Sequence, residues 1–480
     1  VEEANSPLNT SFGILNSEKF TIGKNSNSLQ YLLSFNFDNK YQYREGADRF
    51  FNAAQGNYDN DLFNKQYKYI TNSSALVSLN FKSERLNLTS NTFYLKSTEN
   101  MIQDQLGYTN SATINNNGFI RMNQLTQSDF LNTQLFGTYK VSKDERKNIK
   151  AGISFTKTGF QLPDRKSFKG VLLDDNTTAI TYTGNSLYRQ TMDVDGKFHV
   201  SSMLEYSWLF GKKDIKDAHK LTVGYNSYIN RMDSKFRFLV SDRVSGNAVT
   251  FNTNKPDGTL ASEISNAKFT YREGTNSTYK AKLLEYLNAG YADIAFKISD
   301  VYEMNFGVRV EQSLRLTKYR NPGSFNDPYQ KKSVEDLDIL PSLNMKYKFN
   351  DASNFRLAAS KTITRPVIME SYPLEFVNLD GTIENGNPNV VNSDNYNFDL
   401  KYEFFPTAKE LLAVTTFSKL IQNPIERLFT QSAGSGGQII TYDNSYKSLL
   451  LGAELELLVQ LDRISNSFKN LSLGFNTSLM

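Results

Sequence analysis

The chain has 480 residues, and 54 Lys and Arg against 50 Asp and Glu leave a formal net charge of +4 without a basic block or an acidic tail. This even balance argues against nucleic acid as the main partner. The absence of cysteine excludes a disulfide framework, a thiolate metal site and a cysteine nucleophile.

The composition is polar and rich in aromatic residues. Hydrophobic residues make up 39% of the chain and aromatic residues 13%, with 27 Tyr and 34 Phe. A disordered chain would lack the aromatic residues, and an ordinary soluble core would carry more aliphatic ones. No apolar run reaches the ~18 to 20 residues that cross a bilayer as a helix. The composition therefore fits none of these three classes.

Apolar and polar residues alternate along most of the chain, which indicates strands with one apolar face. In the segment 302–316, for example, Phe306, Val308 and Val310 alternate with polar residues. We count roughly sixteen such runs, many about 10 to 14 residues long, which matches the ~9 to 11 residues of a membrane-crossing strand. They lie near 11–22, 28–38, 71–82, 85–97, 129–141, 149–160, 197–210, 220–232, 284–298, 302–316, 343–349, 354–363, 396–405, 409–420, 446–461 and 470–480.

The connections between these runs alternate between short and long. Short ones fall near 83–84, 142–148, 211–219, 299–301, 350–353 and 406–408. Long ones occupy about 39–70, 98–128, 161–196, 233–283, 317–337, 364–395 and 421–445. This sorting predicts an all-β fold: a transmembrane antiparallel up-and-down β-barrel with short periplasmic turns and long extracellular loops, in the outer membrane of a Gram-negative bacterium.

The pattern offers little for catalysis. The only histidines, His199 and His219, are expected to be a lumen side chain and part of a solvated turn. We therefore predict no catalytic residue, no metal site and no cofactor, and the protein is not expected to be an enzyme. An outer-membrane protease or lipase is the least favoured alternative, because it needs a clustered catalytic set at the barrel mouth.

The segment from about 354 to 426 carries the most distinctive motifs. A strand ends in Thr364-Arg365-Pro366 and is followed by Glu370, then by Gly386-Asn387-Pro388. A strand with Lys401-Tyr402-Glu403 and the loop start Asn423-Pro424 come next. Together these pieces resemble the last third of the barrel of TonB-dependent outer-membrane receptors.

The resemblance implies a barrel of about 22 strands filled by an N-terminal plug, with import driven by the inner-membrane TonB complex. We expect residues 1–480 to form a single barrel domain that is incomplete, with the plug and the C-terminal strands absent from this chain. The motif residues Arg365, Glu370, Asn387 and Asn423 are substrate-binding candidates. The alternative is that they only set the geometry of their loops.

Two functions remain open at this stage. The first is energised uptake of a metal chelate, a glycan or a peptide, with the 233–283 loop as the largest candidate for substrate binding. The second is a transport-inactive, receptor-like barrel that serves as a structural or docking subunit of an outer-membrane complex. Expected partners are outer-membrane lipid, the TonB complex through the plug, and a surface lipoprotein or another outer-membrane protein.

Overall fold

The computed structural model describes residues 5–23, 27–52, 56–109, 117–173, 176–180, 184–212, 214, 217–243, 249–275, 279–320, 328–373, 375–377, 382–431 and 438–480. Nineteen strands belong to one sheet and four to a second, smaller one. Three strands of the large sheet are short outer additions, namely β7 (Thr177–Ile180), β10 (Val249–Asn252) and β11 (Phe269–Glu273). The remaining sixteen form what we call the wall.

Consecutive strands of the wall pair antiparallel with one another, as in an up-and-down barrel. They are β1 (Thr10–Ile22), β2 (Asn27–Asn52), β3 (Asn57–Lys82), β4 (Leu86–Thr109), β5 (Gly118–Lys140), β6 (Lys147–Leu172), β8 (Gly184–Phe210), β9 (His219–Arg243), β12 (Lys280–Lys297), β13 (Tyr302–Arg320), β14 (Gln330–Asn350), β15 (Ser353–Thr364), β18 (Ser393–Phe404), β19 (Leu411–Gln422), β22 (Lys447–Gln460) and β23 (Ser472–Leu479). The predicted fold class is confirmed, and each predicted run corresponds to one wall strand.

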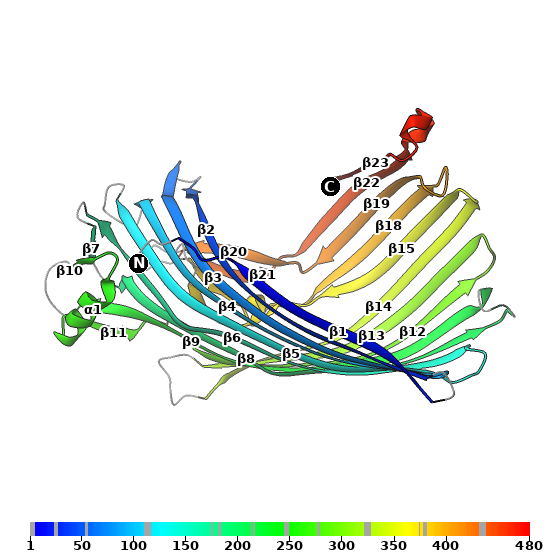
Figure 1. Ribbon diagram of the computed structural model, residues 1–480, viewed down its shortest axis with the longest axis horizontal. Coiled ribbons are helices and arrows are strands. Elements are labelled where there is room, and N and C mark those ends of the chain that lie inside the picture. Colours follow the sequence, from blue (N-terminus) through cyan, green and yellow to red (C-terminus); the bar gives the residue numbers. More distant parts are fainter. Residues whose placement is uncertain are drawn as a thin grey trace.

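The wall is strongly curved and opens between β1 and β23 (Figure 1). Every residue of β1 and of β23 is exposed. Within the described residues, β1 pairs only with β2 and β23 only with β22. Each edge strand therefore presents one side of its backbone without a neighbour, which is costly in a lipid environment.

The strands continue well beyond the membrane, which corrects the expected extent of the long loops. Most of the predicted loop 39–70 is strand, because β2 and β3 remain paired from Ser28 opposite Lys82 up to Asn52 opposite Asn57. Outside the membrane both strand faces meet water or other protein, so alternation disappears while backbone pairing persists. Sequence periodicity therefore detected only the membrane-crossing part of each long strand.

Aromatic side chains mark both ends of the membrane-crossing region. Near the periplasmic ends of β8, β9 and β12, Trp208, Phe210, His219 and Phe296 form a continuous row, with ring centroids 5.1, 5.5 and 5.5 Å apart. At the opposite end, two pairs of tyrosine rings on β2 and β3 contact each other in a tilted arrangement, with centroids 4.7 Å apart for Tyr41 and Tyr69 and 5.1 Å apart for Tyr43 and Tyr67. Such belts lie at the two membrane interfaces.

His219 departs from its expected place in a solvated turn. Its ring packs between Phe210 and Phe296, and its Nδ1 accepts a hydrogen bond from the backbone N–H of Lys297 at 3.2 Å. His199 lies against Tyr228 with ring centroids 5.3 Å apart. The difference arises because cross-strand neighbours, which are remote in sequence, complete the environment of His219.

Helices are few and short in this fold. Those that lie wholly within the described ranges are α1 (Pro256–Ser265), α2 (Ile368–Ser371) and the 3-10 turns Leu461–Arg463 and Asn466–Phe468. Of the helices formed by the described residues, none has the length and apolar character needed to cross a bilayer.

The inside-outside assignment is testable on β5. Leu135 faces outward near the middle of the membrane span and is 42% exposed, whereas the half-buried Gln134 faces the lumen. Leu135→Arg should lower the free energy of unfolding by about 2 to 4 kcal/mol, because it places a charge in hydrocarbon. Gln134→Arg, the matched control, should change it by less than about 1 kcal/mol. Urea unfolding in lipid vesicles measures both values, and equal losses would contradict the assigned faces.

Candidate functional site

A small four-stranded sheet lies inside the curve of the wall (Figure 1). We call it the inner sheet, and it consists of β16 (Glu375–Val377), β17 (Ile383–Asn385), β20 (Ile425–Gln431) and β21 (Gln438–Asn444). Pairing is antiparallel within β16–β17 and β20–β21, and β17 runs parallel to β21 with Ile383 opposite Ile439. It thus joins the β15–β18 and β19–β22 connections into one unit.

The inner sheet is anchored to the far wall by an apolar core. Tyr372 is 2% exposed and belongs to a buried cluster, against which Phe376 and Ile383 also pack. The hydroxyl of Ser234 on β9 donates a hydrogen bond of 3.0 Å to the phenol oxygen of Tyr372, and burial raises the pKa of Tyr372 above its usual range. The wall members of the cluster are Leu162, Tyr188, Met192, Met232, Phe236, Phe238, Val240, Ala281 and Leu283.

A buried charge cluster ties the start of the same segment to the lumen wall. The guanidinium of Arg365 pairs with the carboxylate of Glu311 and lies 4.0 Å from that of Asp338. Arg309 Nε donates to Glu311 at 2.5 Å, and Arg309 Nη1 donates to Asn226 Oδ1 at 2.8 Å. Glu311 is only 6% exposed, so its charge depends on both arginines for compensation.

Two further contacts hold the end of the segment. Arg315 donates to the backbone carbonyl of Val390, and Asn392 Nδ2 donates to the carboxylate of Asp336 at 2.9 Å. A cavity of about 20 Å³ remains between Arg315, Asp336 and Arg365. That volume suits a single water molecule rather than a substrate. The cluster is thus a structural anchor.

The structure brings all four sequence-predicted candidates into this assembly. Arg365 enters the charge cluster, and Glu370 accepts the backbone N–H of Val367 at 2.8 Å. Asn387 donates from its backbone to the carbonyl of Glu370 at 2.7 Å and from its side chain to that of Tyr442 at 2.9 Å. Asn423 adopts a left-handed conformation with φ of 52°.

Hydrogen bonds from β18 and β21 meet at the backbone of Asn423. Its carbonyl accepts from Ser393 Oγ and Asn444 Nδ2, both at 2.8 Å. Asn444 Oδ1 also accepts the backbone N–H of Val391 at 2.8 Å. These contacts position the inner sheet, and a role of the four candidates in substrate binding stays a prediction.

Sequence reasoning missed Tyr372, Ser234 and Asn444 as members of this assembly. A sequence signal existed for the first, because Tyr372 and Phe376 are the two aromatic residues of the connection 364–395. The partner on β9 lies 138 residues away, and no periodicity indicates that contact.

The outer ends of β5, β6 and β8 carry a second folded unit, which we call the outer lobe. It contains β7, β10, β11 and α1 around a core of Phe119, Phe168, Ile180, Leu187 and Phe251. The rings of Phe168 and Phe251 meet edge to face at 5.1 Å. The predicted 233–283 loop is therefore largely folded, although residues 244–248 and 276–278 lie outside the described ranges.

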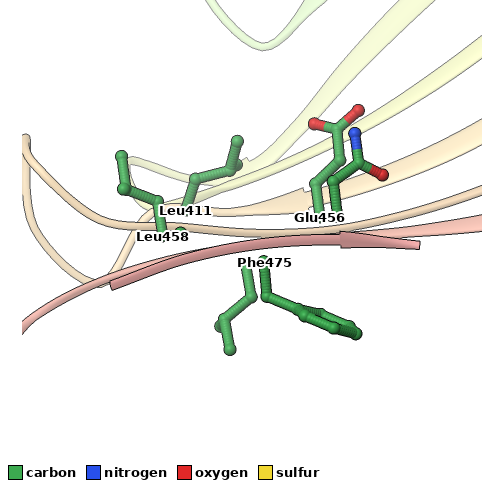
Figure 2. Close-up of a pocket in the computed structure, with 7 residues that line it drawn as sticks. Leu411, Glu456, Leu458 and Phe475 are labelled. Atoms are coloured by element: carbon green, nitrogen blue, oxygen red, sulfur yellow. The ribbon is translucent and has the colours of Figure 1, made fainter. Parts of the chain in front are cut away.

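A larger hollow of about 350 Å³ lies at the β23 edge. Figure 2 shows Leu411, Leu458 and Glu456 on one side of the sheet and Phe475 on the other. Side chains that point to opposite faces cannot enclose a ligand, so this hollow marks the sheet edge rather than a site.

Comparisons with known proteins agree with this architecture. Residues 174–480 match the model of the outer membrane protein beta-barrel family. The chain belongs to this family. It is thus an outer-membrane protein, as predicted. A search of curated proteins found no match.

Solved structures share the fold at low identity. The ferric yersiniabactin uptake receptor FyuA from Yersinia pestis is 13% identical with a TM-score of 0.51, over 98% of this chain and 61% of that one. The copper transporter OprC is 11% identical with a TM-score of 0.50, over 98% and 61%. The chain thus spans about three fifths of the length of these two proteins.

Because the inner sheet is closely packed, we expect that a glycine next to it cannot be replaced by a residue with a side chain without a loss of local stability. A Cβ atom at Gly386 would overlap the backbone carbonyl oxygens of Tyr372 and Met369. Gly386→Ala should therefore displace the inner sheet and increase hydrogen exchange in residues 367–390 by about tenfold or more, which corresponds to a local loss of roughly 1.4 kcal/mol. Gly290→Ala is the control, because nothing lies within 4 Å of its added Cβ. Unchanged exchange in both variants would contradict this packing.

We expect the stability of the inner sheet, which lies outside the membrane-crossing strands, to depend on pH through Tyr442. Burial and then a hydrogen bond to Glu384 raise the pKa of Tyr442 to about 12. Because the folded state holds this proton more tightly than the unfolded chain, the contribution to stability is complete below pH 10 and is lost between pH 10 and about 12. The melting temperature of the native protein should fall relative to Tyr442→Phe only in that window. Parallel curves would contradict it.

Proposed function

We propose that the chain is the barrel of a TonB-dependent outer-membrane receptor that imports a substrate across the outer membrane. The observation that carries this proposal is the inner sheet, which is fixed across the lumen face of the wall by Tyr372 and Arg365. A passive pore keeps a water-filled lumen, whereas a receptor needs a floor on which a ligand from outside is held. An anchored sheet of this kind meets the second requirement.

The outer lobe supports the same proposal. Its own apolar core holds the outer connections in a defined shape, as a binding wall requires. Arg189 on β8 pairs with Asp164 on β6 at 2.8 Å and lies 6.0 Å from the ring of Tyr271, which adds polar and aromatic surface. We infer that the ligand binds between the outer lobe and the inner sheet.

We infer broad classes of substrate rather than a single compound. FyuA is an uptake receptor for ferric yersiniabactin and OprC is a copper transporter. For this chain we propose a metal chelate, a glycan or a peptide, because aromatic rings, amides and charges of both signs occur near the proposed site. One of these two proteins is a receptor and the other is a transporter, which agrees with a function other than catalysis.

The proposed import cycle also requires a plug and contact with the TonB complex. We assign both to a part of the protein beyond residues 1–480, since FyuA and OprC are considerably longer than this chain. Outer-membrane lipid surrounds the barrel, and a surface lipoprotein is a further proposed partner.

A docking subunit is the second candidate, and α1 is the observation that favours it. Leu260 of α1 packs against the core of the outer lobe, and most of the other residues of the helix are exposed, so the helix presents one face outward. A protein partner could use that surface without any transport.

One experiment separates the two functions. Full-length protein in cells with and without TonB is tested for uptake of labelled ferric chelate, oligosaccharide and peptide. Import predicts TonB-dependent uptake of one class, and replacing residues 254–267 by a short Gly–Ser linker should abolish binding of that ligand while the barrel still assembles. Unchanged affinity would refute the outer-lobe assignment, and absence of uptake for all three classes would favour the docking subunit.

A further inference from the structure

The wall strand β14 loses one of its two neighbours about half-way along its length. It pairs with β13 from Gln330 to Tyr347, whereas its pairing with β15 is confined to residues 342–350. Within the part of the chain that the structure describes, residues 330–341 form backbone hydrogen bonds on the β13 side only. We call residues 330–341 the free edge.

The free edge arises from the course of β15 and not from an end of the wall. β15 ends at Thr364, and the chain then turns inward. Arg365 pairs there with Glu311 and lies 4.0 Å from Asp338. Pro341, where the pairing with β15 stops, has no backbone N–H to offer a neighbour. Both strands that flank β14 in the chain are thus in place, and one of them leaves it.

Most of the free edge lies above the hydrocarbon layer. Ile339 comes about 11 residues before the periplasmic end of β14, and a tilted strand crosses that layer in ~9 to 11 residues. Residues 330–338 therefore stand on the extracellular side, where water satisfies their unpaired backbone groups. Leu337 is 71% exposed and Ile339 59%, against 39% for Val310, the neighbour of Ile339 on β13. The departure of β15 thus leaves apolar side chains uncovered as well.

Elsewhere in this fold, short strands cover edges of the same kind. β12 leaves β9 beyond Lys235, and β11 then pairs with residues 239–243 of β9 on the side that β12 has left. β8 likewise leaves β6 beyond Phe168, and β7 pairs with the end of β6 at Val171 and Leu172. Among the described residues, no strand covers the free edge of β14 in this way. The occupant that fits it is therefore a short extended segment of polypeptide.

The free edge has few of the features that keep edge strands from pairing with other chains. Bulges, prolines and lysines serve this purpose in many proteins. The register of the free edge with β13 is uninterrupted, and Pro341 lies at its inner end. Lys331 and Lys332 mark only its outer end. The stretch between these two ends is suited to the addition of a strand.

The side chains along this stretch define the segment that it fits. Glu335 and Leu337 are exposed on the outward face, because they alternate with Asp336, which points to the lumen. Glu335 forms no ion pair with any residue that the structure describes. Opposite charges directly across two strands are stabilising. A complementary segment therefore has an apolar residue opposite Leu337 and a basic residue opposite Glu335.

We propose that the free edge binds an extended segment of a partner protein at the cell surface, which adds to β14 as a strand. Only a polypeptide repeats the ladder of N–H and C=O groups that such an edge offers. The segment would take the place beside β14 that β11 takes beside β9. This surface lies in the plane of the wall and not on the inner sheet, so the inference does not depend on transport.

The test uses the full-length protein in detergent and the fluorescent synthetic peptide Thr-Val-Thr-Lys-Thr-Val-Thr, whose binding is followed by fluorescence anisotropy. Successive backbone N–H groups of a strand point to opposite sides, so only every second one can reach β14. Methylation of that set of nitrogens should weaken binding at least about tenfold, whereas methylation of the other set should leave it unchanged. Equal affinities of the two methylated peptides, or no binding of the parent peptide, would overturn the proposal.

A charge reversal locates the peptide on the protein. Glu335→Lys should weaken binding about fivefold, because it places like charges opposite each other. Asp193→Lys is the matched control, since Asp193 is also exposed but its strand β8 has neighbours on both sides, with Gln161 and Lys235 opposite Asp193. The same loss of affinity in both variants would mean general attraction between charges and would overturn the assignment to the free edge.

Protease protection separates a docked segment from a transported one. Cells that carry the full-length protein are incubated with the peptide and then with an external protease. A docked peptide should stay accessible to the protease with or without TonB. TonB-dependent protection of the peptide would identify it as a substrate and would overturn the assignment to a docked partner, while leaving the proposed import function intact.

Discussion

The structure depends on the need of every backbone N–H and C=O group to find a partner where water is absent. Inside a bilayer an unpaired backbone group costs several kcal/mol. The wall strands from β2 to β22 meet this requirement by pairing each strand with the next along the chain, whereas β1 and β23 are paired on one side within the described residues. The side chains are then free to differ completely between the two faces. Because the wall needs no conventional apolar core, a polar chain with 39% hydrophobic residues can build it.

The inner sheet follows from the same requirement at the outer end of the lumen. The β15–β18 and β19–β22 connections pair with each other, and their remaining polar groups are held by Asn387, Asn423 and Asn444. Tyr372 and Arg365 then fasten the unit to strands that are far away in sequence. The motifs that resemble a receptor family thus have a physical role, which is to join two connections into one hydrogen-bonded unit.

The two faces of the wall use charge differently. On the lumen face Glu311 is buried between Arg309 and Arg365, so each charge is neutralised within the chain. On the outward face of β12 to β14, Lys318 stands opposite both Lys282 and Lys331. Paired charges accordingly hold the inner sheet in place.

The sequence by itself determined that the chain forms sixteen strands, that each has two different faces and that they cross a membrane. Side-chain alternation and strand length are local properties of the chain, so they can be found without the tertiary structure. It also indicated the four motif residues, although not what they contact. Only the tertiary structure decided the extent of the strands beyond the membrane, the inner sheet and the environment of His219. The contact of Ser234 with Tyr372 and the opposition of Lys282, Lys318 and Lys331 depend on strand register and on how connections fold back. Neither is encoded in a local period, because each joins residues that meet only after the wall has curved and paired.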